Sequence, residues 1–277
     1  MVTGVDSRYE AADGEGMPPV ATPRREVRST RVGDGDRATT VHVAVYPRAL
    51  VSATVVALPA PEPLHAWCTR SGIGDALVGG FFVTPAGPAL GEVWRDGQRM
   101  PTAPFDPLFA HARACLHVEG ERLAIAPLAA LPPSPAGDLL QAGPALVSGG
   151  RPIVREGEDR EGFSAGNAQF DSDITAGRHP RAAIGHDDTR LLAVATEGRA
   201  PGEAGLTLPE LAELMAALGA HEAINLDGGG STTLVVGGRL VNRPREADGR
   251  EIPGGRPLLT AVAFVDRIQA QPPAASA

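Results

Sequence analysis

Glycine and proline recur along this chain at intervals that leave little room for long helices. Among its 277 residues, 34 are glycine and 26 are proline, while aromatic residues make up only 4%. Glycine weakens the interior of a helix, proline interrupts it, and both are frequent in turns. We therefore expect a single α+β domain, built on a mixed, largely antiparallel β-sheet with a few packing helices.

The formal net charge of −8 argues against a general nucleic-acid-binding protein. Neutralising a phosphate backbone calls for clustered lysine and arginine, whereas a small phosphorylated ligand needs only a local basic pocket. No stretch approaches 18 uninterrupted apolar residues, so no contact with a membrane is expected. Residues 1–20 include acidic residues and no apolar core segment, unlike a signal peptide. As given, the sequence predicts a cytoplasmic protein.

The two ends of the chain lack hydrophobic periodicity. Residues 1–37 are charged and punctuated by glycine and proline, which predicts a disordered leader. A disordered tail is expected at 269–277, so the folded domain is expected to cover 38–268. Its first strands are expected at 41–45 and 51–58, each ending at a proline. In the first of these strands, His42 is expected to face outward.

The two cysteines, Cys68 and Cys115, are too few for a disulfide framework and belong to no Cys-x-x-Cys pair. We expect two reduced thiols in the core, with a single disulfide bridge as the alternative. A zinc site built from Cys115 with His111 and His117 would lack a fourth ligand at a recognisable spacing. No metal site is therefore predicted.

The last third of the chain has the clearest periodicity. Thr207 and Glu210 have the spacing of a capping box, and apolar residues then recur on one helical face up to Leu218. Gly219 is placed to end this helix. A buried strand is expected at 223–226, and it leads directly into a run of glycines.

This glycine run is the strongest sign of a binding site. Glycine adopts backbone conformations closed to other residues and lets several N–H groups approach a ligand, which suits an anion. Asp227 precedes the run Gly228–Gly230, and Ser231 and Thr232 follow it. A tight turn without a ligand is the alternative. A P-loop is excluded because the run lacks its lysine, and a dinucleotide fingerprint because strand follows strand.

The segment from His179 to Pro244 resembles the phosphodiester glycosidase family, through the blocks HPR, TEGR, GLT, NLDGGGS and VNRP. Two earlier blocks, GGFF at 79–82 and QAGPALVSGG at 141–150, match that family in the same order. The resemblance covers roughly residues 40–266. It implies a mixed α/β domain that hydrolyses a sugar-1-phosphodiester, releasing the sugar and leaving a phosphomonoester.

The resemblance also implies a set of site residues. Asp227 is the expected catalytic carboxylate, Glu197 its partner and Arg181 the clamp for the phosphate. These types suit the chemistry, because glycosyl transfer commonly uses two carboxylates and a departing phosphate needs donors that hold its charge. A structural role is the alternative for each. The residues expected to bind the substrate are Gly79, Gly80, Phe81, Thr207, Asn225, Gly228, Gly229, Gly230, Ser231, Thr232 and Asn242.

Two positions depart from the family pattern. Val78 stands where the family usually has asparagine, and Glu197 stands where aspartate is commoner. A catalytically silent glycan-binding or scaffold protein with the same fold is therefore the alternative to a hydrolase. Hydrolysis at phosphorus is a third, weaker hypothesis, because no cluster of metal ligands is visible.

The expected partner is a phosphorylated carbohydrate substrate. No cofactor is predicted, although Asp side chains and backbone carbonyls near the glycines could hold a divalent cation without a recognisable motif.

Overall fold

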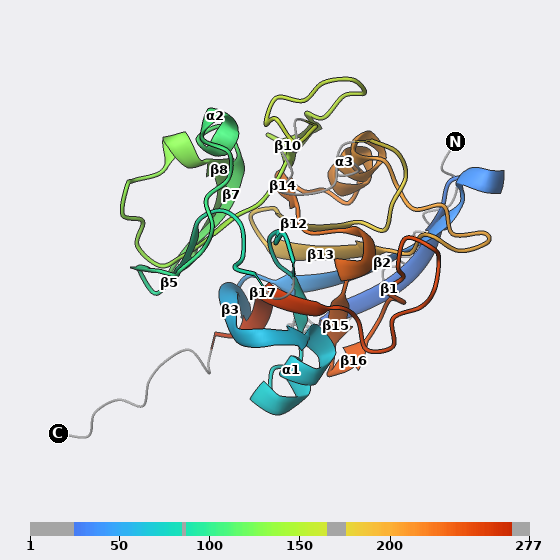
Figure 1. Ribbon diagram of the computed structural model, residues 1–277, viewed down its shortest axis with the longest axis horizontal. Helices are drawn as coiled ribbons and strands as arrows, with labels where there is room; N and C mark the ends of the chain where they lie inside the picture. The colour runs from blue at the N-terminus through green and yellow to red at the C-terminus, as the bar shows by residue number, and fades with distance from the viewer. Residues whose placement is uncertain (1–24, 85–86, 165–175, 268–277) are drawn as a thin grey trace, which may run out of the picture.

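A seven-stranded antiparallel sheet forms the centre of the molecule (Figure 1). The computed structural model describes residues 25–84, 87–164 and 176–267. In spatial order, the strands of this sheet are β1 (Glu26–Val32), β2 (Thr39–Pro47), β13 (Arg190–Thr196), β12 (Ala182–His186), β14 (Glu222–Asn225), β10 (Ala145–Ser148) and β11 (Arg151–Pro152).

Two five-stranded antiparallel sheets accompany the central one. The first consists of β16 (Arg239–Leu240), β15 (Leu234–Val236), β4 (Ala76–Val78), β17 (Pro257–Asp266) and β3 (Val51–Pro63). The second consists of β6 (Gln98–Arg99), β5 (Val93–Arg95), β9 (Asp138–Gln141), β7 (Ala114–Glu119) and β8 (Arg122–Pro127). The first packs against one face of the central sheet, as the stacked rings of Tyr46 and Phe264 show, with centroids 4.3 Å apart.

The opposite face of the central sheet packs against helix α3 (Leu208–Ala217) (Figure 1). Leu211 and Met215 of the helix share a buried cluster with Val43 and Val194 of the sheet. Strand residues alternate between the two faces, so each central strand contributes to both cores. The other helical elements in the described ranges are α1 (Leu64–Ser71), α2 (Pro107–Ala110) and the 3-10 turns at Gly35–Arg37, Leu128–Ala130 and Gly229–Ser231.

The expected α+β architecture with a largely antiparallel sheet is confirmed. The capping box is also confirmed, since Thr207 Oγ1 accepts the N–H of Glu210 and the Glu210 carboxylate accepts the N–H of Thr207. Strand β3 runs past Pro59, where the sequence predicted its end. It is an edge strand, so a missing N–H is tolerated on its outer side.

The expected leader is wrong in its second part. Residues 26–32 form β1, which pairs antiparallel with β2 over its whole length. Six of its seven residues are exposed, so no hydrophobic pattern marked it as a strand. Residues 1–24 and the expected tail at 269–277 lie outside the described residues.

Cys68 and Cys115 are free and buried, and burial raises the pKa of both thiols. The expectation of two reduced core thiols is thus confirmed. Within the described ranges, no helix is long and apolar enough to cross a membrane.

Candidate active site

Three segments that are distant in the sequence meet at one end of the central sheet. Residues 197–199 follow β13, the glycine bend at 227–231 follows β14, and residues 242–245 follow β16. The N–H of Arg243 donates to Glu197 Oε1 at 3.0 Å, and Arg199 Nη1 donates to the carbonyl of Arg245 at 3.1 Å. Asn242 Nδ2 donates to the carbonyl of Thr232, directly after the bend, so the TEGR, NLDGGGS and VNRP blocks come together.

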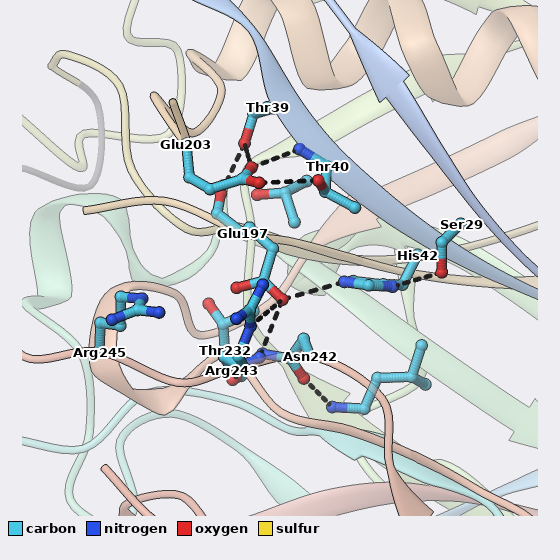
Figure 2. Close-up of polar contacts among 12 residues, drawn as sticks. Ser29, Thr39, Thr40, His42, Glu197, Glu203, Thr232, Asn242, Arg243 and Arg245 are labelled. Carbon is cyan, nitrogen blue, oxygen red and sulfur yellow. Dashed lines mark hydrogen bonds and ion pairs between the residues drawn. The ribbon is translucent and has the colours of Figure 1, made fainter. Parts of the chain in front are cut away.

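Glu197 is buried at the centre of this cluster (Figure 2). It is 3% exposed, and its Oε1 lies 3.0 Å from His42 Nε2 and 3.0 Å from the backbone nitrogen of Arg243. Among the described residues, its Oε2 has no hydrogen-bond partner. A buried acceptor left without a hydrogen bond costs about 1–3 kcal/mol, so Glu197 is a candidate site residue on these grounds.

The backbone of Glu197 is fixed by the first residues of β2. Its N–H donates to the carbonyl of Thr40 at 2.9 Å, and Thr39 Oγ1 donates to its carbonyl at 3.0 Å. The carboxylate of Glu203 in turn accepts the Thr40 N–H and both threonine hydroxyls (Figure 2). Burial opposes ionisation of Glu203, but these hydrogen bonds and the charge of Arg31 lower its pKa below the ordinary value.

His42 was missed as a site residue, because the sequence predicts an outward-facing position. The side chain is instead 7% exposed and points toward Glu197 (Figure 2). Its Nδ1 lies 2.7 Å from Ser29 Oγ on β1. The contact with Glu197 spans 155 residues, and no local pattern in the sequence could reveal it.

The glycine bend connects the central sheet to its neighbour. Asp227 is half-buried, its N–H donates to the Gly79 carbonyl at 3.0 Å, and its Oδ1 accepts the N–H of Gly228 at 2.9 Å. Gly229 has φ of +58° and donates its N–H to the carbonyl of Pro180 at 2.8 Å. This left-handed conformation explains the need for glycine at the middle position.

Two guanidinium groups lie against the bend. A Cβ atom at Gly229 would stand 3.0 Å from Arg199 Nη2, and one at Gly230 would stand 2.7 Å from Arg256 Nη2. Arg256 also forms an ion pair with Glu246. The missing glycine side chains therefore make room for positive charge beside the backbone of the bend.

Arg199 adopts an uncommon backbone conformation, with φ of +61°. Such a residue costs of the order of 1–3 kcal/mol and persists only where its surroundings hold it. Although Arg199 belongs to the TEGR block, no pattern in the sequence favoured it over Glu197. Positive φ at a large polar residue, packed on Gly229, marks it as a candidate site residue.

Arg181 was expected to clamp the phosphate. The residue is 3% exposed, and its guanidinium donates from Nε to the Leu206 carbonyl at 3.1 Å and from Nη2 to the Gly177 carbonyl at 3.2 Å. Its backbone lies close to Gly228. These bonds give it a structural role in joining β12 to the segments at 177 and 206, and the role of phosphate clamp stays a prediction.

Several expected substrate-binding residues hold the bend in place. Asn242 Oδ1 accepts the N–H of Leu234 at 2.9 Å, and its Nδ2 donates to the carbonyl of Thr232 at 2.8 Å. Asn225 Nδ2 donates to the carbonyl of Gly143 at 2.9 Å. Within the described part of the chain, Asn225 Oδ1 and Thr232 Oγ1 are buried without a hydrogen-bond partner. Ser231 is likewise buried, at 2% exposed.

The remaining expected residues have clear packing roles. Gly79 approaches β17 so closely that a Cβ atom would stand 2.5 Å from Thr260 Oγ1, and Gly80 donates its N–H to the same oxygen at 2.9 Å. Phe81 is 2% exposed and packs against the rings of Phe105 and Phe163. Their contact with a substrate stays a prediction.

A cavity of about 560 Å³ lies on the α3 side of the sheet. Of the expected site residues, Thr207 lines it. Gly177, whose carbonyl accepts from Arg181, and Pro144, whose carbonyl accepts from Asn225, also line it. In the ranges that the structure describes, no three His, Cys, Asp or Glu side chains form a group able to hold a metal ion.

Comparison of the sequence with known proteins identifies a family that matches most of the chain. The family model described as phosphodiester glycosidase matches residues 74–265. A mouse N-acetylglucosamine-1-phosphodiester alpha-N-acetylglucosaminidase is 29% identical over 182 residues, which cover 64% of this chain and 34% of the mouse protein. The chain thus matches about a third of the length of that relative.

Solved structures show the same fold at low sequence identity. The catalytic domain of the zebrafish N-acetylglucosamine-1-phosphodiester alpha-N-acetylglucosaminidase, auto-inhibited by its pro-peptide, has a TM-score of 0.68 and 20% identity, over 90% of this chain and 85% of that one. A hypothetical protein from Synechocystis has a TM-score of 0.58 and 17% identity, over 89% and 64% of the two chains. A putative exported protein from Burkholderia pseudomallei has a TM-score of 0.58 and 19% identity, over 82% and 74%.

The family match includes the GGFF block, the TEGR segment with Glu197, the glycine bend and Asn242. It extends over well more than half of the chain. The protein therefore belongs to the phosphodiester glycosidase family.

Proposed function

We propose that this protein is a hydrolase that cleaves the glycosidic bond of a sugar-1-phosphodiester, releasing free sugar and a phosphomonoester. The observation that carries the proposal is the buried Glu197 carboxylate, which has one oxygen held by hydrogen bonds and the other without a partner among the described residues. Glu197 belongs to the same short segment as Arg199, whose guanidinium lies against the glycine bend.

In the proposed reaction, two carboxylates act at the anomeric carbon and two arginines hold the departing phosphate. Water attacks the anomeric carbon, the bond from that carbon to the phosphate oxygen breaks, and the phosphate leaves with the electron pair. Glu197 and Asp227 are the carboxylates available to take the proton of the attacking water and to stabilise the positive charge that develops on the sugar. Which of them does each task depends on how the sugar lies between them.

The departing phosphate is already an anion, so it needs donors that hold charge more than an acid that supplies a proton. Arg199 and Arg256 lie at Gly229 and Gly230, where they supply such donors beside the backbone of the bend. Guanidinium groups suit phosphate because they donate two parallel hydrogen bonds. A single well-placed donor typically lowers the barrier by about 3 kcal/mol.

A catalytically silent binding protein is the second candidate, and two departures from the family pattern favour it, at Val78 and at Glu197. Val78 is 0% exposed within the main hydrophobic core, and its N–H donates to the carbonyl of Thr233 at 2.9 Å. An apolar side chain suits this buried position. The departure at Val78 therefore has a packing explanation and does not count against catalysis.

The test is hydrolysis in water labelled with heavy oxygen. The probe is the methyl diester of N-acetylglucosamine-1-phosphate, chosen because the name of the mouse relative specifies an N-acetylglucosamine-1-phosphodiester. Label in the released sugar supports the proposal. Label in the phosphate would show attack at phosphorus, and absence of turnover across a panel of sugar-1-phosphodiesters would favour the silent binding protein.

A further inference from the structure

Strand β1 provides a chain of contacts that ends on the candidate catalytic carboxylate. Ser29 Oγ lies 2.7 Å from His42 Nδ1, and His42 Nε2 lies 3.0 Å from Glu197 Oε1 (Figure 2). Ser29 and His42 are directly opposite each other in the antiparallel pairing of β1 with β2. The ring of His42 is thus held on both sides, between a hydroxyl and a carboxylate.

Strand β1 buries little of its side-chain surface, so core packing does not explain why it is present. Six of its seven residues are exposed, and Val27 is 45% exposed. Its polar side chains nevertheless reach toward Glu197 on one face of the strand. Ser29 contacts His42, and Arg31 forms an ion pair with Glu203, whose carboxylate holds the two threonines that fix the Glu197 backbone.

We propose that Ser29 and His42 are positioning residues for Glu197, an inference that rests on the proposed function. The Ser29 hydroxyl donates to His42 Nδ1, and the N–H at His42 Nε2 donates to Glu197 Oε1. Together with the N–H of Arg243, this places two donors on the same carboxylate oxygen. These two donors leave Oε2, which is buried, as the carboxylate oxygen without a hydrogen-bond partner among the described residues.

The N–H of Arg243 decides which way the hydrogen bonds run from Ser29 through His42 to Glu197. An Oε1 that already accepts an N–H from Arg243 is suited to accept another hydrogen bond as an ionised carboxylate oxygen. The guanidinium of Arg243 adds positive charge, with its Nε 4.0 Å from the same oxygen. The reverse arrangement would put a proton on Oε1 and compete with the Arg243 N–H. Ser29 thereby selects the tautomer that His42 needs as a donor.

The first test is spectroscopic and needs no substrate. In protein labelled with nitrogen-15 at histidine, long-range proton–nitrogen correlations show which ring nitrogen of His42 carries the proton. The His42→Gln variant assigns the signals by removing them. We expect a protonated Nε2 and an unprotonated Nδ1 in the wild type, and a mixture of tautomers in Ser29→Ala. A wild-type ring protonated at Nδ1 would overturn the proposal.

The second test is kinetic, with Thr30→Ala as the matched control on the opposite face of β1. Partners that orient a reactive group typically change activity by about 10–100-fold. We expect Ser29→Ala and His42→Ala to lower kcat by such factors with KM nearly unchanged. His42→Gln keeps a side-chain N–H near the position of Nε2 and should recover part of the loss. Equal losses in His42→Gln and His42→Ala, or a loss in Thr30→Ala as large as that in Ser29→Ala, would contradict the positioning role.

The two tests separate this inference from the proposed function. If the wild type turns over no sugar-1-phosphodiester, the hydrolase assignment fails, while the tautomer of His42 still supports or contradicts the hydrogen-bond chain. If the wild type is active and Ser29→Ala and His42→Gln both keep full kcat, the positioning role fails and the hydrolase assignment stands. Melting temperatures of the variants identify any loss that comes from unfolding.

Discussion

Two buried glutamates, in different parts of the molecule, use their carboxylates in opposite ways. Glu161 is 9% exposed, and its two oxygens each accept a backbone N–H, from Ala114 of β7 at 2.8 Å and from Ala145 of β10 at 2.7 Å. Glu197 is 3% exposed, and both of its donors converge on Oε1. Both oxygens of the Glu161 carboxylate accept hydrogen bonds, and together they join two sheets. In Glu197, by contrast, Oε2 has no hydrogen-bond partner among the described residues.

The difference separates a structural carboxylate from a reactive one better than burial does. Burial raises the pKa of Glu161 to about 7, although the two N–H donors and Arg113 oppose the shift. A shifted pKa in a buried acid is a common sign of an active site, but structural acids have it too. For these two residues, the arrangement of hydrogen bonds around each oxygen is the more informative property.

The largest expected effect is that glutamine has opposite consequences at the two positions, lowering activity at Glu197 and stability at Glu161. Glu197→Gln should lower kcat by about 10³-fold or more, which corresponds to about 4 kcal/mol of barrier, because the amide neither takes a proton readily nor carries the negative charge that stabilises the sugar cation. Its stability should stay the same or rise, since a buried charge is removed. Glu161→Gln should keep its turnover but lose about 1–3 kcal/mol of unfolding free energy, because an NH₂ group then faces a backbone N–H.

Turnover of a sugar-1-phosphodiester and denaturant unfolding of the same samples measure this exchange. Glu213→Gln, an exposed position on α3, is the matched control and should change neither quantity. If Glu197→Gln remained as active as the wild type, or if Glu161→Gln lost activity at full stability, the distinction between the two residues would be wrong.

The second expected effect is a dependence of stability on pH that belongs to Glu161 alone. Its ordinary pKa of 4.5 describes the unfolded chain, and its folded pKa is about 7. The folded state therefore binds more protons between these values, so this contribution to stability is present below pH 4.5 and lost as pH rises through 7. The loss amounts to about 3 kcal/mol. Unfolding free energies at pH 5 and pH 8 should show it in the wild type, and an identical difference in Glu161→Gln would assign it to another group.

The same contrast explains how much of the molecule the sequence predicts. Periodicity and capping are local signals, so β2, β14 and α3 were predicted close to their observed positions. The order of the motif blocks also predicted that Glu197, the glycine bend and Asn242 would lie together. Strand β1 was missed because its residues are polar on both faces, and its pairing with β2 is what defines it.

The details within the site were harder to predict, because they depend on directions of side chains. The sequence places Arg181 beside the bend, but not that its guanidinium would be bonded to the carbonyls of Leu206 and Gly177. Arg256 lies 26 residues beyond Gly230 in a loop without periodicity, and only the folded chain brings them together. The unpaired oxygen of Glu197 is likewise a property of the packed structure.

The third expected effect concerns the strained backbone of Arg199. Arg199→Gly should relieve the positive φ at that position, which offsets the loss of its contacts, so stability should change by less than about 1 kcal/mol. Activity should nevertheless fall by about 100–1000-fold, because a donor for the departing phosphate is lost. A combined measurement of kcat and unfolding decides the case. A large loss of stability with normal kcat would make Arg199 a structural residue like Glu161.

The smallest expected effect extends the comparison to a third carboxylate, at the far end of β12 and β13. Asp187 Oδ1 accepts the N–H groups of Thr189 and Arg190, both at 2.7 Å. Burial opposes its ionisation, but the hydrogen bonds from Arg190 and Thr189 lower its pKa from 3.8 to about 2. This contribution is therefore present above pH 3.8 and lost as pH falls through 2, the opposite sign from Glu161.

Asp187→Asn should cost about 1 kcal/mol at pH 6, a modest value because solvent screens this partly exposed turn. The difference from the wild type should shrink as the pH approaches 2, and kcat should not change. Unfolding curves at several pH values measure it. A difference that stayed constant with pH would mean that the turn needs the shape of the side chain rather than its charge. The Asp187 carboxylate would then stabilise the turn through its shape alone. The Glu197 oxygen without a partner among the described residues would remain the feature that separates a reactive carboxylate from a structural one.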